Sequence, residues 1–183
     1  MSPTANRALL TLATVPLCWV AMTAVHELGH CVGLWATGGA VERVVLHPLA
    51  ISRTDAAANP RPLPTVWAGP VLGVALPLFV WGVTAAARLP GAFVARFVAG
   101  FCCVANGCYI GAGVAAPVGD AKQMPRLGSP AWTLGLFGAA CTLVGFALWN
   151  RQGGRFGWGD APEEVTPAVA WTTAGVAAAG AFG

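Results

Sequence analysis

The hydrophobic positions of this sequence fall into long, almost uncharged stretches separated by short charged segments. A membrane-spanning helix needs about 20 consecutive apolar residues, within a range of about 17–25. The stretches predict five helices, at about 8–36, 65–87, 95–117, 131–150 and 167–183. The last is short and rich in alanine and glycine, so it can be a span, an interfacial segment or part of a longer protein. We therefore expect an all-α polytopic membrane protein with about five transmembrane helices, forming a single domain over residues 1–183.

The segment between the first two predicted helices has a different pattern. It opens with Gly38 and Gly39 and ends in a proline-rich stretch, NPRPLP, which is typical of a linker. Between them, apolar side chains recur at Val41, Val44, Val45, Leu46, Leu49 and Ile51. β-Branched residues bounded by turn residues favour strands. We expect one or two short strands here, as a small β-rich insertion after the first helix.

Composition narrows the class of protein further. The chain is 56% hydrophobic and 9% charged, whereas a soluble globular domain carries about 25% charged residues. The net charge of +3 is scattered, so no basic stripe is available and we expect no nucleic-acid partner. The six cysteines lie inside the apolar stretches, which favours buried free thiols over a disulfide framework. We therefore expect an integral, multi-pass membrane protein whose surroundings are the lipid bilayer.

The first apolar stretch contains the motif His26-Glu27-Leu28-Gly29-His30, which is H-E-x-x-H. Residues four apart share one face of a helix, so both imidazoles can bind one zinc ion. Glu27 can then accept a proton from a water at the metal. A charged or polar group inside an apolar helix is costly to bury, and a metal would supply a partner for all three side chains. The alternative is a polar cluster that is hydrogen-bonded between helices.

A catalytic zinc site has three protein ligands, so one more is needed. Asp120 is the only acid besides Glu27 in or close to the predicted spans. The first span ends on the same membrane side as the third, which places His30 and Asp120 near one face. We expect Asp120 to be the third ligand. The alternative is a loop aspartate that caps a turn or pairs with Lys122.

These motifs resemble the site-2 protease family of intramembrane zinc metalloproteases, in its compact form without a PDZ domain. The HELGH motif in the first span and the following β-rich segment are similar to the family pattern. Ala68-Gly69-Pro70 resembles its A-G-P, and Asn106 with Pro117-Val118-Gly119-Asp120 resembles its N…P-x-x-D segment. The resemblance covers about residues 15–125, and residues 126–183 add further helices. In this sequence Ala121 follows Asp120 where the family often has glycine.

The resemblance implies hydrolysis of peptide bonds in membrane-anchored protein substrates, with Zn²⁺ as cofactor and Glu27 as base. It also suggests that Asn106 lines the substrate site. His47 lies in the β-rich insertion and can approach the metal, although a histidine in a loop or strand is the simpler interpretation. Two other functions stay open: a metal-binding membrane protein without protease activity, and a transporter subunit with an intramembrane ion path.

Overall fold

The computed structural model describes residues 2–46, 52–159 and 161–182. Within these ranges the chain forms six α-helices, one antiparallel pair of strands and a short 3₁₀ helix. The elements in chain order are α1 (Pro3–Ala36), β1 (Ala40–Val45), β2 (Arg53–Ala58), α2 (Pro62–Ala86), α3 (Ala92–Ala112), α4 (Gly119–Arg126), α5 (Ala131–Trp149), η1 (Gly153–Phe156) and α6 (Pro167–Phe182). The predicted all-α fold with a small β-rich insertion is therefore confirmed.

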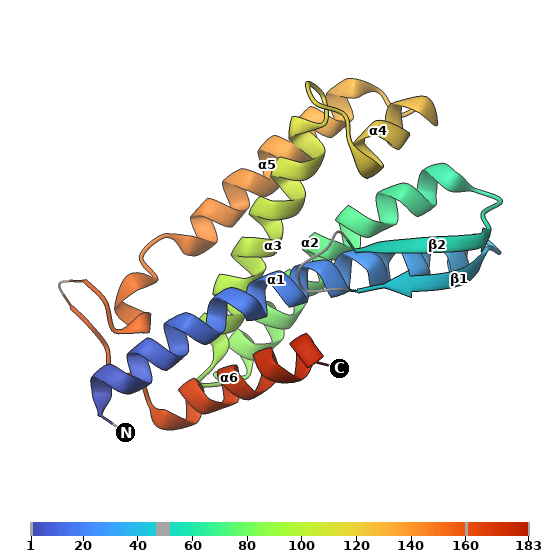
Figure 1. Ribbon diagram of the computed structural model, residues 1–183. Helices are drawn as coiled ribbons and strands as arrows, with labels where there is room; N and C mark the ends of the chain where they lie inside the picture. The colour runs from blue at the N-terminus through green and yellow to red at the C-terminus, as the bar shows by residue number, and fades with distance from the viewer. Residues whose placement is uncertain (1, 47–51, 160, 183) are drawn as a thin grey trace.

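Helix α1 runs along the length of the molecule, with the hairpin of β1 and β2 against one end and α6 against the other (Figure 1). It begins with Ser2 as its N-cap, whose hydroxyl oxygen accepts from the backbone N–H of Ala5, and Pro3 occupies the first turn. Proline is well tolerated there because the first N–H groups of a helix have no intrahelical partner. The helix spans 34 residues, more than the about 20 that a bilayer requires.

Four helices in the described ranges are long and apolar enough to cross a membrane: α1, α2, α3 and α5. They correspond to the first four predicted spans. Helix α6 forms where the fifth was expected, but its 16 residues fall short of the usual length of a span. It packs along α1 instead, where Gly180 allows close contact with Val20.

The insertion after α1 is a two-stranded antiparallel hairpin in which Val44 is paired with Thr54. The first strand covers the valines on which the prediction rested. The second strand, Arg53–Ala58, lies further along the chain than the apolar positions suggested. Leu49 and Ile51 lie outside the described residues. At the hairpin surface the Asp55 carboxylate accepts hydrogen bonds from Arg43 at 2.9 Å and from Arg53 at 3.2 Å. The Arg43–Asp55 ion pair links the two strands, whereas Arg53 and Asp55 both lie on β2.

Helices α3 and α5 pack side by side through glycines (Figure 1). A Cβ atom added at Gly111 would lie 3.0 Å from the Cα of Gly138, so only hydrogen fits between the two backbones. Small residues at such positions let membrane helices approach closely. All six cysteines are free thiols; four are buried as expected, whereas Cys108 is exposed and Cys141 is half-buried.

Helix α4 was not predicted, and the third predicted span ends at Ala112 rather than near residue 117. A turn of the chain follows Ala112 and leads into α4. Its buried residues Ala121 and Met124 join a cluster with Val66, Ile110 and Leu134, contributed by α2, α3 and α5. Burial of these side chains holds the short polar helix against the ends of the long ones, and it fixes the position of the first turn of α4.

Candidate metal centre

His26 and His30 lie one turn apart on α1, where α2 crosses it closely. Gly29 makes this approach possible, because a Cβ there would collide with the carbonyl oxygen of Ala68. Gly69 leaves room for the imidazole ring of His30, because a Cβ at Gly69 would overlap that ring. Gly69 therefore lets α2 pack directly against a site histidine.

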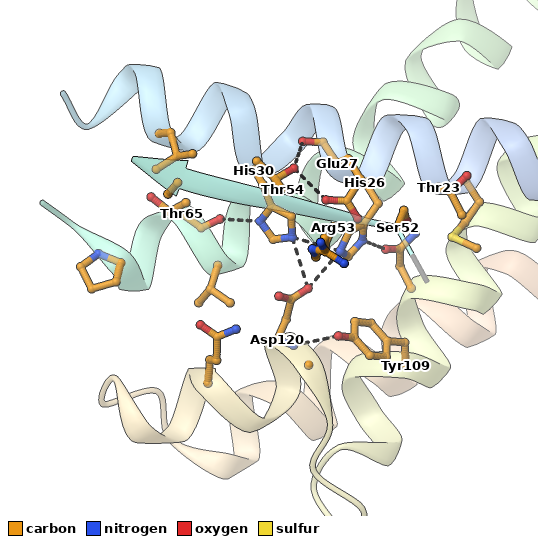
Figure 2. A pocket seen from close by; sticks show the side chains of 18 of the residues that line it. Thr23, His26, Glu27, His30, Ser52, Arg53, Thr54, Thr65, Tyr109 and Asp120 are labelled. Atoms are coloured by element: carbon orange, nitrogen blue, oxygen red, sulfur yellow. Dashed lines mark hydrogen bonds and ion pairs between the residues drawn. The ribbon is translucent and has the colours of Figure 1, made fainter. Parts of the chain in front are cut away.

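Asp120 reaches the histidines from the first turn of α4. The backbone N–H of Asp120 donates to the hydroxyl oxygen of Tyr109 on α3, at 2.7 Å. Gly119, the preceding residue, has φ +49°, a left-handed conformation that favours glycine. A Cβ at Gly119 would also collide with the Tyr109 hydroxyl. Glycine and tyrosine together direct the Asp120 carboxylate towards α1 (Figure 2).

Three side-chain atoms converge at this point, one from each of His26, His30 and Asp120. The Oδ2 atom of Asp120 lies 2.9 Å from Nε2 of His26 and 3.3 Å from Nε2 of His30, and the two Nε2 atoms are 3.2 Å apart. The side chains of His26, His30 and Asp120 are 11%, 12% and 14% exposed, respectively. Such a nearly equilateral group of two nitrogens and one carboxylate oxygen can hold a metal ion.

The other nitrogen of each ring is held by a fixed acceptor. Nδ1 of His30 lies 3.0 Å from the carbonyl oxygen of Thr65, which can only accept, so Nδ1 carries the proton. Nδ1 of His26 lies 2.8 Å from Oδ1 of Asn106, whose amide nitrogen donates to the carbonyl of Cys102. The amide oxygen of Asn106 therefore faces His26 as an acceptor. In the neutral rings both Nε2 atoms then carry lone pairs, and these point at each other and at a carboxylate.

The two imidazoles also determine the charge state of the aspartate, which lies outside the four candidate spans. Burial alone would raise the pKa of Asp120. When the two imidazoles are protonated, hydrogen bonds from their Nε2 atoms outweigh that cost and hold the pKa of the carboxyl well below its usual range. Asp120 is therefore ionised at neutral pH. Its carboxylate faces the two histidines, as expected for a third ligand, and not Lys122.

A cavity of about 920 Å³ opens beside the three ligand atoms and is lined by residues of α1, β2, α2, α3 and α4. Glu27 lines it and is only 4% exposed. Asn106 also lines the cavity, beside the site as the sequence suggested. Its amide oxygen contacts Nδ1 of His26. His47 lies outside the described residues.

Several contacts of the site were not predicted from sequence. The Thr65 acceptor is a backbone carbonyl, which carries no residue-specific signal. The contacts of Tyr109 with Gly119 and with the backbone of Asp120 were not foreseen either. Thr54 on β2 also reaches the site, where its hydroxyl donates to the Glu27 carboxylate at 2.8 Å.

No protein-family model matches this chain, and neither does any curated protein or solved structure. The chemistry of the site itself, with three converging ligand atoms beside a buried carboxylate, therefore carries the functional conclusion.

Proposed function

We propose that this chain is an integral membrane zinc metalloprotease of the site-2 protease type. The single observation that carries the proposal is the convergence of three acceptors. Two imidazole nitrogens whose partner nitrogens are fixed as donors face an ionised carboxylate within 3.3 Å. Three acceptors so placed repel one another unless protons or a metal cation lie among them. A metal ion satisfies all three at once, and H-E-x-x-H is the helical pattern that binds zinc in metalloproteases.

The donor set fits zinc. Zinc prefers imidazole nitrogen and carboxylate oxygen at about 2.0–2.2 Å, so two ligands of a tetrahedral ion lie about 3.3–3.6 Å apart. The three separations here are 2.9, 3.2 and 3.3 Å. The ligand atoms need to shift by only a few tenths of an ångström to meet that requirement. His26, His30 and Asp120 are thus the residues that would hold the ion, and a fourth position stays open to the cavity.

A zinc ion bound here supplies a Lewis acid and makes water acidic enough to act as a nucleophile at neutral pH. Glu27 is the base: its carboxylate accepts the proton of the attacking water and returns it to the leaving amine. The helix places Glu27 directly after His26, so the base and two of the three proposed ligands come from one rigid element. The cavity admits both water and an extended segment of substrate, since it is lined by polar and apolar side chains alike.

Three of the candidate spans, α1, α2 and α3, line the cavity, and this indicates the kind of substrate. A helical peptide bond hides its carbonyl oxygen in an intrahelical hydrogen bond, so a membrane helix must unwind before it is cut. The resemblance of residues 15–125 to the site-2 protease family supports membrane-anchored protein substrates. A cavity that is lined by candidate membrane spans and also holds charged side chains suits such substrates.

Two measurements test the proposal. Elemental analysis of protein purified in detergent should give about one zinc per chain, and the double variant His26→Ala/His30→Ala should lose it. For cleavage, the protein is reconstituted in vesicles with a fluorescently tagged single-span protein whose apolar segment contains a central Asn-Pro pair. Glu27→Gln should keep the zinc and cleave nothing, because glutamine preserves size and loses the base.

The exposed Glu42 on β1 provides a matched control, since Glu42→Gln makes the same chemical change away from the cavity. It should cleave at the wild-type rate. Zinc retained in the double histidine variant would overturn the metal site. Zinc bound by a wild type that cleaves no better than Glu27→Gln would instead favour a metal-binding protein without protease activity.

A further inference from the structure

Thr54 joins the hairpin to the buried carboxylate of the site. Its hydroxyl lies 2.8 Å from Oε2 of Glu27, across the gap between β2 and α1 (Figure 2). The same hydroxyl lies 3.4 Å from the backbone carbonyl of Glu27, which is a much weaker alternative acceptor. The hydroxyl proton therefore goes to the carboxylate. A hydrogen bond to a charged acceptor is among the stronger kinds found in proteins.

Glu27 needs such a partner because of its place on the helix. Successive residues of an α-helix are rotated by about 100°, so Glu27 leaves α1 in a different direction from His26 and His30. The two histidines are held by α2 and α3, through Thr65 and Asn106. Glu27 is held from a third direction, by a strand that follows it by 27 residues in the chain. Without this contact the long side chain would have several rotamers open to it within the cavity.

The hairpin is built to hold Thr54 at this point. Thr54 is paired with Val44 of β1, which fixes the register of β2. On either side of it, Arg53 and Asp55 form an ion pair at the surface, and Asp55 also accepts from Arg43. Side chains alternate across a strand, so a shift of register by one residue would replace the hydroxyl with a charged group. Arg53 lines the cavity too, but its hydrogen bonds to other described residues go to Asp55, whereas the Thr54 hydroxyl donates to Glu27.

We infer that Thr54 is a positioning residue for Glu27, fixing the carboxylate in the orientation from which it accepts a proton. The inference rests on the proposed function, and it assigns the hairpin of this chain a specific part in that function. A general base works only within hydrogen-bonding reach of the proton that it takes. Loss of the Thr54 hydroxyl therefore slows the chemical step and leaves zinc binding intact, because Thr54 contacts none of the three ligand side chains in the described interactions.

The test compares Thr54→Val with Thr54→Ser in the vesicle assay with the single-span substrate. Valine has the shape of threonine without its hydroxyl, whereas serine keeps the hydroxyl. Thr84→Val is the matched control, because Thr84 is half-buried and its hydroxyl donates to a helix carbonyl, that of Trp81, far from the site along α2. The readouts are kcat, KM, zinc content and the melting temperature of each purified protein.

Thr54→Val should lower kcat about 10–100-fold with KM within about twofold and with full zinc content. Thr54→Ser should restore kcat to within about threefold of wild type, and Thr84→Val should match wild type. A kcat for Thr54→Val equal to that of wild type would overturn the inference. So would an equal loss in Thr54→Ser, or a loss that follows zinc content or melting temperature, because each would point to a structural role alone.

The proposed function fails by a different result, namely a wild type that does not cleave or a Glu27→Gln variant that does. Either of those outcomes would overturn the positioning role as well. When wild type cleaves and Glu27→Gln does not, the Thr54 variants decide the inference by themselves.

Discussion

The Nδ1 nitrogen of His30 lies 3.0 Å from the carbonyl oxygen of Thr65, and it can only donate to that oxygen. A residue on α2 thus fixes which nitrogen of an α1 histidine faces Asp120. The hydrogen bond depends on the close approach of the two helices, which the glycines at their crossing permit. Partners of this kind, which orient a ligand without touching the metal, typically affect metal affinity by about 10–100-fold.

Gly69→Ala should displace His30, because the added methyl group would overlap its imidazole ring. We expect zinc affinity to fall by about tenfold or more, as measured by competition with a chromogenic chelator. Gly82→Ala is the control on the same helix, since a Cβ there has nothing within 4 Å. Equal zinc affinity in the two variants would mean that the ring is not held where the structure has it.

Asn106→Leu should remove the acceptor for Nδ1 of His26 and leave that buried N–H without a partner. Zinc affinity should fall by about 10–100-fold. Asn106→Asp keeps an oxygen in the same place and should retain most of the affinity. If leucine and aspartate are equally tolerated in the chelator competition, Asn106 acts on something other than His26.

Asp120→Ala should weaken zinc binding severely, because it removes one of three converging ligand atoms and leaves two histidines. Asp55→Ala is the comparison, since Asp55 lies on the hairpin and pairs with Arg43 and Arg53. Zinc content per chain by elemental analysis should be unchanged for Asp55→Ala. A structure of the zinc-loaded protein with the Asp120 carboxylate more than about 4 Å from the ion would refute its assignment as a ligand.

Gly119→Ala should damage the site more than its backbone strain explains. Gly119 and Gly128 both have positive φ, +49° and +98°, so alanine is strained at either position. Only at Gly119 does the new methyl group also meet a neighbour, the Tyr109 hydroxyl that holds the Asp120 backbone. We expect Gly119→Ala to lower zinc affinity and Gly128→Ala to lower only the melting temperature. Similar zinc affinities in both variants would contradict the role of the Tyr109 contact.

The long helices could be predicted from sequence because each one buries or presents to lipid an uninterrupted apolar stretch. Helix α4 could not, since its eight residues, GDAKQMPR, are mostly polar and too few for a periodic pattern. Its helical form depends on Ala121 and Met124, which pack against other helices. Strand β2 lies further along the chain than the apolar positions predicted, and the reason is similar. Asp55 pairs there with Arg43 across the strands and with Arg53 on its own strand, and a hydrophobic pattern does not reveal such ion pairs.

The candidate metal site could also be predicted only in part. The spacing of His26 and His30 predicts a shared helix face, and the order of the spans predicts that Asp120 lies near their end of the molecule. The structure brings these side chains together, and their binding of zinc stays a prediction. What the spacing could not supply are the contacts that orient the side chains. Thr65 contributes a backbone oxygen, and the pairing of Thr54 with Glu27 depends on a hairpin register that only the folded chain defines.

The arrangement of these contacts has a practical consequence for work on the purified protein. The histidines of one helix are aligned by residues of two others, Thr65 on α2 and Asn106 on α3, and the aspartate comes from a fourth. A peptide that contains HELGH alone lacks all three supports. At the proposed zinc site, tight metal binding would therefore report correct tertiary assembly, because it requires four segments to come together at once. Loss of metal during extraction into a given detergent would reveal loosened helix packing before any change in helical content.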